Sequence, residues 1–345
     1  MTLPQHITII GDGSMATVCA LLLESRGLGV TMWGPFGDHV AQMIQTRQNQ
    51  KYLPGYRLPE GITLTADDAA AFDRAELIVS AIPTQFVRPA WQRVAAHTPA
   101  GVGIVSVAKG VEQETMLRPT QVISDVLAKA GVDDADKPAR PLAALSGPSV
   151  ADELARCLPA TVCAAADDEG FARIVQQTFT THWFRVYTNT DLLGVELAGA
   201  TKNVIALAAG ILDGLQAGNN AKSALLSRGL VEITRLGVAM GARAETFFGL
   251  TGVGDLATTC FSPTGRNRTC GEQLGKGRKL DEVLASIPGV VEGVPTTKAV
   301  IALAQRYKVE MPITEAVNQV LFEGLDPLEA IGRLMSRQPK AEKVA

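Results

Sequence analysis

The stretch that decides the fold is Ile7-Thr-Ile-Ile10 followed by Gly11-Asp-Gly13-Ser-Met-Ala16. A short apolar strand that runs into Gly-x-Gly-x-x-Ala and then into a helix is the context of the dinucleotide-binding fingerprint. Gly11 permits the tight turn, Gly13 lets a pyrophosphate approach the backbone, and Ala16 is small enough for the helix to pack on the strand. Chance is the alternative, because the chain has 33 glycines. The position after an N-terminal strand favours a cofactor site, with the pyrophosphate at the helix N-terminus.

Two features near this loop bear on the choice of cofactor. Asp12 lies inside the loop, where a carboxylate repels phosphate groups unless it points away. The second strand ends in Trp33-Gly-Pro35, at the place where an NAD-selective site usually carries an Asp or Glu for the ribose hydroxyls. The sequence has neither that acid nor an arginine nearby. We therefore expect NAD or NADP as the cofactor, with tolerance of NADP as a hypothesis.

The first half of the chain alternates short apolar runs with helical stretches. The runs are almost continuously apolar, which is typical of strands buried in a parallel sheet. The stretches between them have the periodicity and length of crossover helices, so the pattern predicts a doubly wound sheet. The expected strands are 6–10, 29–33, 77–83, 102–107, 142–146 and 160–165, and the expected helices are 16–24, 85–96 and 117–130.

After Thr188-Asn-Thr-Asp191 the apolar spacing becomes helical as far as Arg337, with breaks expected at 218–220, 262–263, 295, 312 and 327. The chain is therefore predicted to be α/β plus all-α. We expect a Rossmann-type dinucleotide-binding domain at 1–190, a helical substrate-binding and catalytic domain at 191–337, and a frayed tail at 338–345. The polar segment 132–141 contains prolines and is predicted to be an exposed loop inside the first domain.

Length and composition exclude several classes of protein. A chain of 345 residues suits two domains, and 46% hydrophobic with 19% charged residues describes a globular protein. A net charge of −3 gives no basic excess for nucleic acid. The first residues lack a basic region and no apolar run approaches membrane-spanning length, so neither a targeting peptide nor membrane insertion is expected. Five cysteines without a CxxC pair and four histidines fit a reducing cytoplasm and argue against a metal site.

Lys202 is the candidate catalytic residue. Gly194, Ala198 and Lys202 are spaced four apart, so a helix places the lysine on one face with residues of little bulk. Partial burial would lower the pKa of the amine toward the range useful for proton transfer, whereas a carboxylate such as Asp255 would oppose that shift. The resting charge of the amine stays open. A solvated lysine on a surface helix is the alternative.

Lys202, Asp255 and Arg266 are residue types that suit the reduction of a ketone and the binding of an anionic group. Hydride transfer to a ketone leaves negative charge on oxygen, which an ammonium group can stabilise and then protonate. A guanidinium presents paired donors that match phosphate oxygens, and the turn before Arg266 could add backbone N–H groups. Lys109 follows a predicted strand, at the sheet edge where doubly wound folds bind ligands. For Lys109 the alternative is a solvated loop lysine.

A set of motifs that runs in order across nearly the whole chain resembles the bacterial-type NAD(P)-dependent glycerol-3-phosphate dehydrogenase family. The resemblance implies a Rossmann domain followed by a helical domain. It also implies reversible reduction of dihydroxyacetone phosphate to sn-glycerol 3-phosphate, which supplies glycerophospholipid synthesis. The motifs are the Gly11 loop, Lys51-Tyr-Leu-Pro-Gly55, Ser106-Val-Ala-Lys-Gly-Val-Glu112, Leu145-Ser-Gly-Pro-Ser149, 195–203, 220–229, Gly249-Leu-Thr-Gly-Val-Gly-Asp-Leu256, Gly265-Arg-Asn267 and Val291-Glu-Gly293.

The resemblance also implies roles for single residues. Lys202 is similar to the family's proton acceptor, and Arg266 to the arginine that meets the substrate phosphate close to the cofactor. The other residues at substrate-binding positions are Lys109, Gly147, Ser149, Asp255, Gly265 and Asn267. The residues at cofactor-binding positions are Gly11, Gly13, Ser14, Met15, Pro35, Lys109, Ala151, Arg266, Val290 and Glu292. A homodimer is a further expectation from the resemblance.

The chain departs from the family pattern at four positions. Gly265 replaces a serine before Arg266, which removes a hydroxyl donor but keeps the backbone N–H. Met15 replaces an aromatic residue, Ala16 a glycine, and Pro35 a basic residue after the second strand. These departures bear on cofactor preference more than on the reaction.

Two other functions are alternatives to the reduction of a phosphorylated ketone. One is a related dehydrogenase that acts on a different hydroxy acid, because an arginine binds carboxylates as well as phosphates. The other is a dinucleotide-sensing protein without catalysis. Single motifs also have ordinary explanations: 252–255 could be a helix-capping turn, 146–149 could end a strand and cap a helix, and Cys260 and Cys270 could be small core residues.

Overall fold

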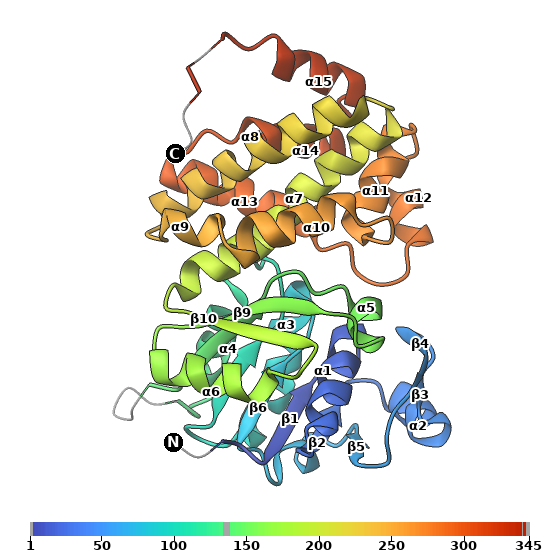
Figure 1. Cartoon of the computed structure of the whole chain (residues 1–345), viewed down its shortest axis with the longest axis vertical. Coiled ribbons are helices and arrows are strands. Elements are labelled where there is room, and N and C mark those ends of the chain that lie inside the picture. Colours follow the sequence, from blue (N-terminus) through green and yellow to red (C-terminus); the bar gives the residue numbers. More distant parts are fainter. Residues whose placement is uncertain (1–2, 134–138, 340, 343–345) are drawn as a thin grey trace. The chain divides into compact units, whose positions relative to one another are not determined.

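The computed structural model describes residues 3–133, 139–339 and 341–342. The chain divides into two compact units (Figure 1). Unit 1 consists of Met1–Ala108 and Pro119–Leu192, and unit 2 of Lys109–Arg118 and Leu193–Ala345. The segment Lys109–Arg118 thus groups with the helical unit although the chain on either side of it belongs to unit 1.

Unit 1 is built on a sheet of eight strands among the described residues, in the order β10-β9-β8-β7-β6-β1-β2-β5. The six strands expected from their apolar runs are confirmed, two of them with shorter bounds. Two more strands, β5 and β10, lie at the two edges. The bounds are β1 (His6–Ile10), β2 (Gly29–Trp33), β5 (Ile62–Thr65), β6 (Leu77–Ser80), β7 (Gly103–Ser106), β8 (Leu142–Ser146), β9 (Ala160–Ala166) and β10 (Phe184–Asn189).

The strand order makes this a doubly wound sheet. From β1 the chain passes through helix α1 (Ser14–Ser25) to β2 on one side, and from β6 it passes through α3 (Thr84–Val94) to β7 on the other. Right-handed crossovers in opposite directions place the two helices on opposite faces. In agreement, α1 packs with α5 (Ala151–Ala155) and α6 (Glu169–Phe179), while α3 packs with α4 (Pro119–Lys129). The connections diverge between β1 and β6, where such sheets bind ligands beyond the carboxyl ends of the strands.

The expected parallel sheet is confirmed for six strands, and it is interrupted at one edge. β9 runs antiparallel to β8, and β10 runs parallel to β9, so this pair is reversed relative to the other six. The short α5 lies between β8 and β9, and the chain there does not return to the amino end of the sheet before pairing. An apolar run carries no mark of its direction, which is why the sequence did not reveal the reversal.

Smaller elements complete unit 1. They are α2 (Gly37–Thr46), the antiparallel pair β3 (Gln48–Asn49) and β4 (Leu53–Arg57), and the single turns η1 (Ala70–Phe72) and η2 (Ala95–His97). The expected loop 132–141 lies partly outside the described residues. Near its far end Ala139 is exposed as expected, but Arg140 is buried, because its guanidinium binds the Asp133 carboxylate and the carbonyl groups of Pro99 and Val102.

Among its described residues unit 2 contains helices and no strand, and these helices pack around a core separate from that of unit 1. The break expected at 262–263 is confirmed. Gly218, Pro312 and Pro327 each begin a helix, so a break precedes each of them. Pro295 instead lies in the first turn of α13, where a proline is tolerated. The helices are α7 (Leu192–Gly214), α8 (Gly218–Ala239), α9 (Ala244–Phe247), η3 (Leu250–Gly254), α10 (Asp255–Phe261), α11 (Arg266–Gly275), α12 (Leu280–Ser286), α13 (Gly293–Tyr307), α14 (Pro312–Phe322) and α15 (Pro327–Met335).

Helix α7 bears on the expectation that no uninterrupted apolar run approaches membrane-spanning length. It is long and apolar enough to cross a membrane by length and composition, although Glu196 and Lys202 interrupt its apolar run. Nearly all of its most apolar window is buried inside the protein. This burial is the property of a core helix in a globular domain.

Candidate active site

One buried carboxylate in unit 2 binds two lysines. Asp255, the first residue of α10, places Oδ1 2.8 Å from the Nζ of Lys202 on α7 and Oδ2 2.8 Å from the Nζ of Lys109. Asp255 is 2% exposed and Lys202 5% exposed. The structure therefore brings together three predicted residues that are up to 146 positions apart in the chain. The alternative of a solvated surface lysine is wrong for Lys202.

The surroundings of Lys202 set its proton affinity. Burial lowers the pKa of its ammonium group to about 8, Asp255 opposes this shift, and the charge of Lys109 adds to it. At neutral pH the group is therefore mainly protonated, and above about pH 9 it is mainly neutral. Lys202 also donates a hydrogen bond to the Thr259 hydroxyl, which itself donates to the Asp255 carbonyl oxygen at 2.7 Å. The amine is thus held by two partners from one helix.

A π-helical turn aims Asp255 at the lysines. The motif 251–255 forms η3 and the first residue of α10, and π turns inside helical segments are frequent at functional sites. A β-carbon at Gly252 would lie 1.8 Å from the carbonyl oxygen of Phe247, so glycine is required there. No side-chain hydrogen bond caps α10. The Asp255 carboxylate binds lysines instead, which contradicts the simple capping explanation of this motif.

Arg266 is fixed relative to α7 by an unusually close helix crossing. α11 begins at Arg266 and crosses α7 at glycines on both helices. A β-carbon at Gly271 would lie 2.0 Å from the carbonyl oxygen of Leu207, and one at Gly210 2.0 Å from that of Arg268. The helices can approach this closely because both positions lack side chains. The first-turn N–H groups of α11 have no acceptor inside the helix and suit an anion together with the guanidinium.

Side-chain amides connect the predicted segments of unit 2. The Gly293 N–H donates to Asn267 Oδ1 at 2.8 Å, Asn267 Nδ2 donates to Asn203 Oδ1 at 2.9 Å, and Asn203 Nδ2 donates to the Lys109 carbonyl at 2.9 Å. This chain joins the start of α13 and the start of α11 to α7 and to the segment that carries Lys109. Asn267 is 8% exposed, so its side chain is first of all a link between these segments.

Three other predicted residues lie around Arg266. Desolvation lowers the pKa of the guanidinium, and the neighbouring Glu292 carboxylate opposes that shift. Val290 and Glu292 lie in the segment immediately before α13. At Gly265, the backbone N–H donates to the Ser262 carbonyl at 3.2 Å inside the turn. The N–H that remains where the family has a serine is thus engaged within the protein.

In unit 1 the Gly11 loop has the form that a dinucleotide requires. Gly11 has φ +132°, and a β-carbon there would lie 2.7 Å from the Ala81 carbonyl oxygen. A β-carbon at Gly13 would meet nothing within 4 Å, so open space lies beside the N-terminus of α1. Ala16 is fully buried against the sheet. These residues fit a pyrophosphate at the helix N-terminus, with Gly13 leaving room for its approach.

The other predicted residues of unit 1 lie at the carboxyl ends of its strands. Ser14 and Met15 open α1, Pro35 follows β2, and Ala151 opens α5. Gly147 and Ser149 follow β8, where the Ser149 hydroxyl donates to the Gly147 carbonyl at 3.0 Å. Among the described residues no group of three or more His, Cys, Asp or Glu side chains could hold a metal ion.

An arginine from another element reaches the end of β2, which corrects the expectation that none is nearby. Arg93 of α3 donates to the Pro35 carbonyl at 2.7 Å and to Asp68 at 2.8 Å. Its guanidinium also lies over the Trp33 ring. The 58 positions between Pro35 and Arg93 hid this contact from the sequence.

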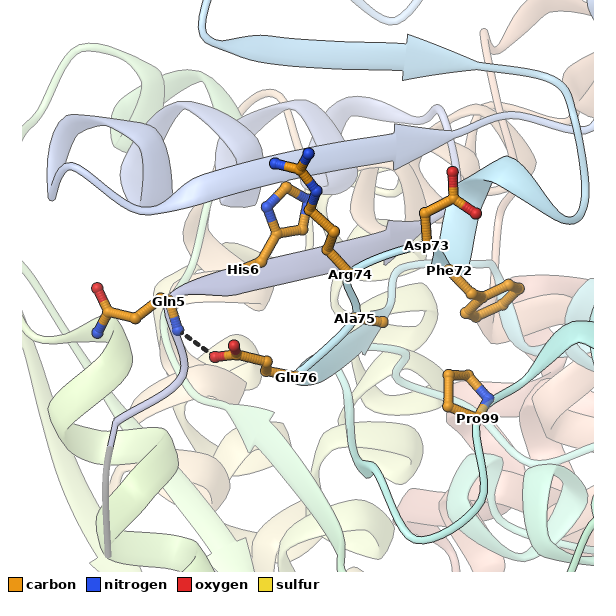
Figure 2. Close-up of a pocket in the computed structure, with 8 residues that line it drawn as sticks. All are labelled: Gln5, His6, Phe72, Asp73, Arg74, Ala75, Glu76 and Pro99. Carbon is orange, nitrogen blue, oxygen red and sulfur yellow. Dashed lines mark hydrogen bonds between the residues drawn. The ribbon is translucent and has the colours of Figure 1, made fainter.

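A concavity of about 660 Å³ in unit 1 lies away from this loop (Figure 2). It is lined by residues at the amino ends of β1 and β6, among them His6, Arg74 and Glu76, and the Gln5 N–H donates to Glu76 Oε2 at 2.6 Å. Parallel sheets bind their ligands at the opposite, carboxyl ends of the strands. This concavity is therefore not the cofactor site.

Comparison with known proteins identifies the family. Residues 6–172 match the model of the NAD-dependent glycerol-3-phosphate dehydrogenase N-terminus, and residues 191–332 match that of the C-terminus. The chain belongs to the NAD-dependent glycerol-3-phosphate dehydrogenase family. It is 45% identical over 338 residues to glycerol-3-phosphate dehydrogenase (NAD(P)+) 1 of Salinibacter ruber, covering 98% of this chain and 97% of the relative.

Further members of the glycerol-3-phosphate dehydrogenase family agree over the same length. The enzyme named glycerol-3-phosphate dehydrogenase (NAD(P)+) from Geobacillus kaustophilus is 46% identical over 339 residues, covering 98% of this chain and 96% of that one. The crystal structure of glycerol-3-phosphate dehydrogenase from Coxiella burnetii superposes with a TM-score of 0.90 at 36% identity, covering 97% of this chain and 99% of that one. The resemblance stated from the motifs is confirmed.

Sequence reasoning missed several residues that build the site. Thr259 binds Lys202, and Asn203 links Lys109 to Asn267. In unit 1, Asn49 donates to the Asp12 carbonyl and to the Thr17 hydroxyl, both at 2.8 Å, and so holds the Gly11 loop. Thr259 could have been found, because it lies one helical turn after Asp255 and shares its face. Asn49 gave no such signal.

Proposed function

We infer that the chain is an NAD(P)-dependent dehydrogenase that interconverts dihydroxyacetone phosphate and sn-glycerol 3-phosphate, the latter used for glycerophospholipid synthesis. The observation that carries this inference is the Asp255 carboxylate with Lys109 and Lys202 bound to its two oxygens. The family match and the cofactor loop agree with it. The reading as a dehydrogenase of another hydroxy acid loses support, since the relatives are named for glycerol 3-phosphate.

Lys202 is the proton donor for ketone reduction and the proton acceptor for alcohol oxidation. When bound, the nicotinamide cofactor exchanges hydride with the substrate carbon. In reduction, the Lys202 ammonium stabilises the negative charge that develops on the substrate oxygen and gives it a proton. In oxidation, the neutral amine removes the hydroxyl proton. A pKa of about 8 makes both forms accessible near neutral pH.

Lys109 and Asp255 orient the substrate and hold the charge of Lys202 in balance. Asp255 places one carboxylate between two cations, so the uncharged carbonyl group of the substrate meets a cluster with a net positive charge. That charge favours an oxyanion and not the resting ketone, which is the condition for lowering the barrier. We place Gly147 and Ser149 at the substrate as well, on the family resemblance.

Arg266 and the first turn of α11 bind the substrate phosphate. The guanidinium offers paired donors, and the helix N-terminus adds partial positive charge. The Asn267 side chain is joined to Asn203 and Gly293. Asn267 therefore acts on the phosphate through its backbone N–H and through the placement of α11.

The roles of the two units follow from these residues. Unit 1 binds the cofactor through Gly11, Gly13, Ser14, Met15, Pro35 and Ala151. On the family resemblance, unit 2 contributes four further cofactor-binding positions, Lys109, Arg266, Val290 and Glu292. We assign the boundary between the domains to 190/191 and a homodimer as the assembly. Light scattering tests the assembly, and cell fractionation tests the cytoplasmic location.

The function is tested by following the absorbance of NADH and NADPH with the purified chain and dihydroxyacetone phosphate. Unphosphorylated dihydroxyacetone and pyruvate are the controls. Oxidation should depend on the phosphorylated ketone. Replacement of Lys202 (Lys202→Ala) should lower kcat by about 10²-fold or more, as expected for loss of a general acid, with nucleotide affinity unchanged. Nucleotide binding without turnover of any ketone would support the sensor instead.

A further inference from the structure

Asp12 has a buried carboxylate that the mechanism does not use. The residue is 7% exposed, and its Oδ2 has no hydrogen-bond partner within the described part of the chain. Its backbone is fixed, because its carbonyl accepts a hydrogen bond from Asn49 Nδ2 at 2.8 Å. An unsatisfied buried acceptor is costly. A side chain held this firmly in a cofactor loop needs a functional explanation.

The carboxylate of Asp12 lies at the end of β2. A β-carbon at Gly34, the first residue after that strand, would be 2.8 Å from Asp12 Oδ2 and 2.9 Å from Asp12 Cβ. In Rossmann-type sheets an Asp or Glu at this strand end binds the hydroxyl groups of the adenosine ribose. This chain has no acid on β2 itself. Asp12 supplies a carboxylate at the same place from the neighbouring loop, and Gly34 leaves space for it.

The charges around Asp12 favour hydroxyl donors over a second anion. Burial raises the pKa of the carboxyl, whereas His39 and Lys51 lower it. Hydrogen bonds from two ribose hydroxyls would satisfy the oxygen atom, but a ribose 2′-phosphate offers negative charge and acceptors. Arg93, the cation near Pro35, has its donors on Asp68, the Pro35 carbonyl and the Ala66 carbonyl. The Asp68 carboxylate balances the charge of Arg93, which weakens the attraction of this guanidinium for a phosphate.

We propose that Asp12 is a specificity-determining residue that binds the adenosine ribose hydroxyls and rejects a 2′-phosphate, so that the protein binds NADH more tightly than NADPH. The proposal rests on nucleotide binding at the Gly11 loop, as in the proposed function. It replaces tolerance of NADP, which rested on the missing acid at the end of β2. It also explains why a carboxylate lies in a loop that binds phosphate groups, which it would otherwise repel.

The test measures nucleotide affinity without substrate, on the full chain. NADH and NADPH are titrated by fluorescence, and ADP and 2′-phosphorylated ADP by calorimetry. The unchanged chain should bind NADH and ADP more tightly than their 2′-phosphorylated partners. In Asp12→Asn the ratio of the two dissociation constants should fall by about tenfold or more, the size expected for loss of a hydrogen bond to a charged group.

The control variant is Asp38→Asn, which removes an exposed carboxylate of α2 and changes the net charge equally. It should leave the ratio unchanged. Asp12→Ala, with its thermal melting curve, shows whether the loop survives. A preference for NADPH in the unchanged chain would overturn the proposal, as would equal changes for both nucleotides in Asp12→Asn. Absence of all nucleotide binding in the unchanged chain would contradict the proposed function itself.

Discussion

At the scale of single residues, the charge of Lys202 should govern the pH dependence of the reaction. Burial lowers its pKa to about 8. Reduction needs the ammonium form, so kcat/KM for dihydroxyacetone phosphate should be level below pH 8 and fall about tenfold per unit above it. Oxidation needs the amine and should show the opposite profile. Replacement of Asp255 (Asp255→Asn) removes the opposing charge and should move both breaks to lower pH.

Steady-state rates in both directions, with nucleotide affinity followed over the same pH range, check this prediction. If kcat/KM for reduction stays constant up to pH 9, Lys202 is not the proton donor.

Motifs could predict some residues of the site but not their partners. Lys202, Asp255 and Arg266 each lie in a distinctive local pattern, and the first two meet as expected. The amide of Asn203 binds that of Asn267, 64 positions away, and nothing near either residue marks that contact. Hydrogen bonds between distant side chains depend on how helices cross. That information is spread over the small residues of α7 and α11 and is absent from the motifs themselves.

At the scale of elements, the interior strands were predictable and the edge strands were not. The interior strands β1, β6 and β7 are buried almost throughout, so their sequences are continuously apolar. The edge strand β10 alternates buried and exposed side chains over part of its length. Polar residues at its exposed positions hide it among loops. The same applies to the four-residue β5, whose threonines alternate with apolar residues.

The stability of the folded chain should depend on pH through Glu232 of α8, whose carboxylate binds the start of α14. This buried carboxylate accepts hydrogen bonds from the N–H groups of Ile313 and Thr314. Burial raises its pKa to about 7, although these hydrogen bonds oppose the shift. Between pH 4.5 and 7 the folded chain holds a proton that the unfolded chain has lost. Stability from this group therefore falls as pH rises, by up to about 3 kcal/mol.

Melting temperatures from pH 5 to 8 test this dependence against Glu232→Gln, which cannot ionise and should show a flatter profile. Glu329→Gln, in an exposed pair with Arg333, is the control and should keep the original slope. If Glu232→Gln keeps that slope as well, the carboxylate does not titrate as stated.

At the scale of the whole molecule, a buried ion pair holds one end of the segment that makes unit 2 discontinuous. This segment, Lys109–Arg118, is bounded on both sides by unit 1 in sequence. Arg118 binds Glu196 of α7 at one end of the segment, and Asn203 binds the Lys109 carbonyl at the other. Breaking a buried pair by removing one partner typically costs about 3–5 kcal/mol. Glu196→Gln should therefore loosen the segment and lower kcat, because Lys109 loses its fixed position.

Hydrogen exchange by mass spectrometry localises this effect. In Glu196→Gln, exchange should accelerate in Lys109–Arg118 and in the first turns of α7, while unit 1 keeps its protection and its affinity for nucleotide. The matched control is Glu169→Gln, which removes an exposed partner of Arg173 and should change little. Faster exchange throughout unit 2 would mean that the rest of this unit needs the segment in order to stay folded. Unchanged exchange would mean that other contacts of the segment, among them those of Lys109 with Asp255 and with Asn203, hold it in place.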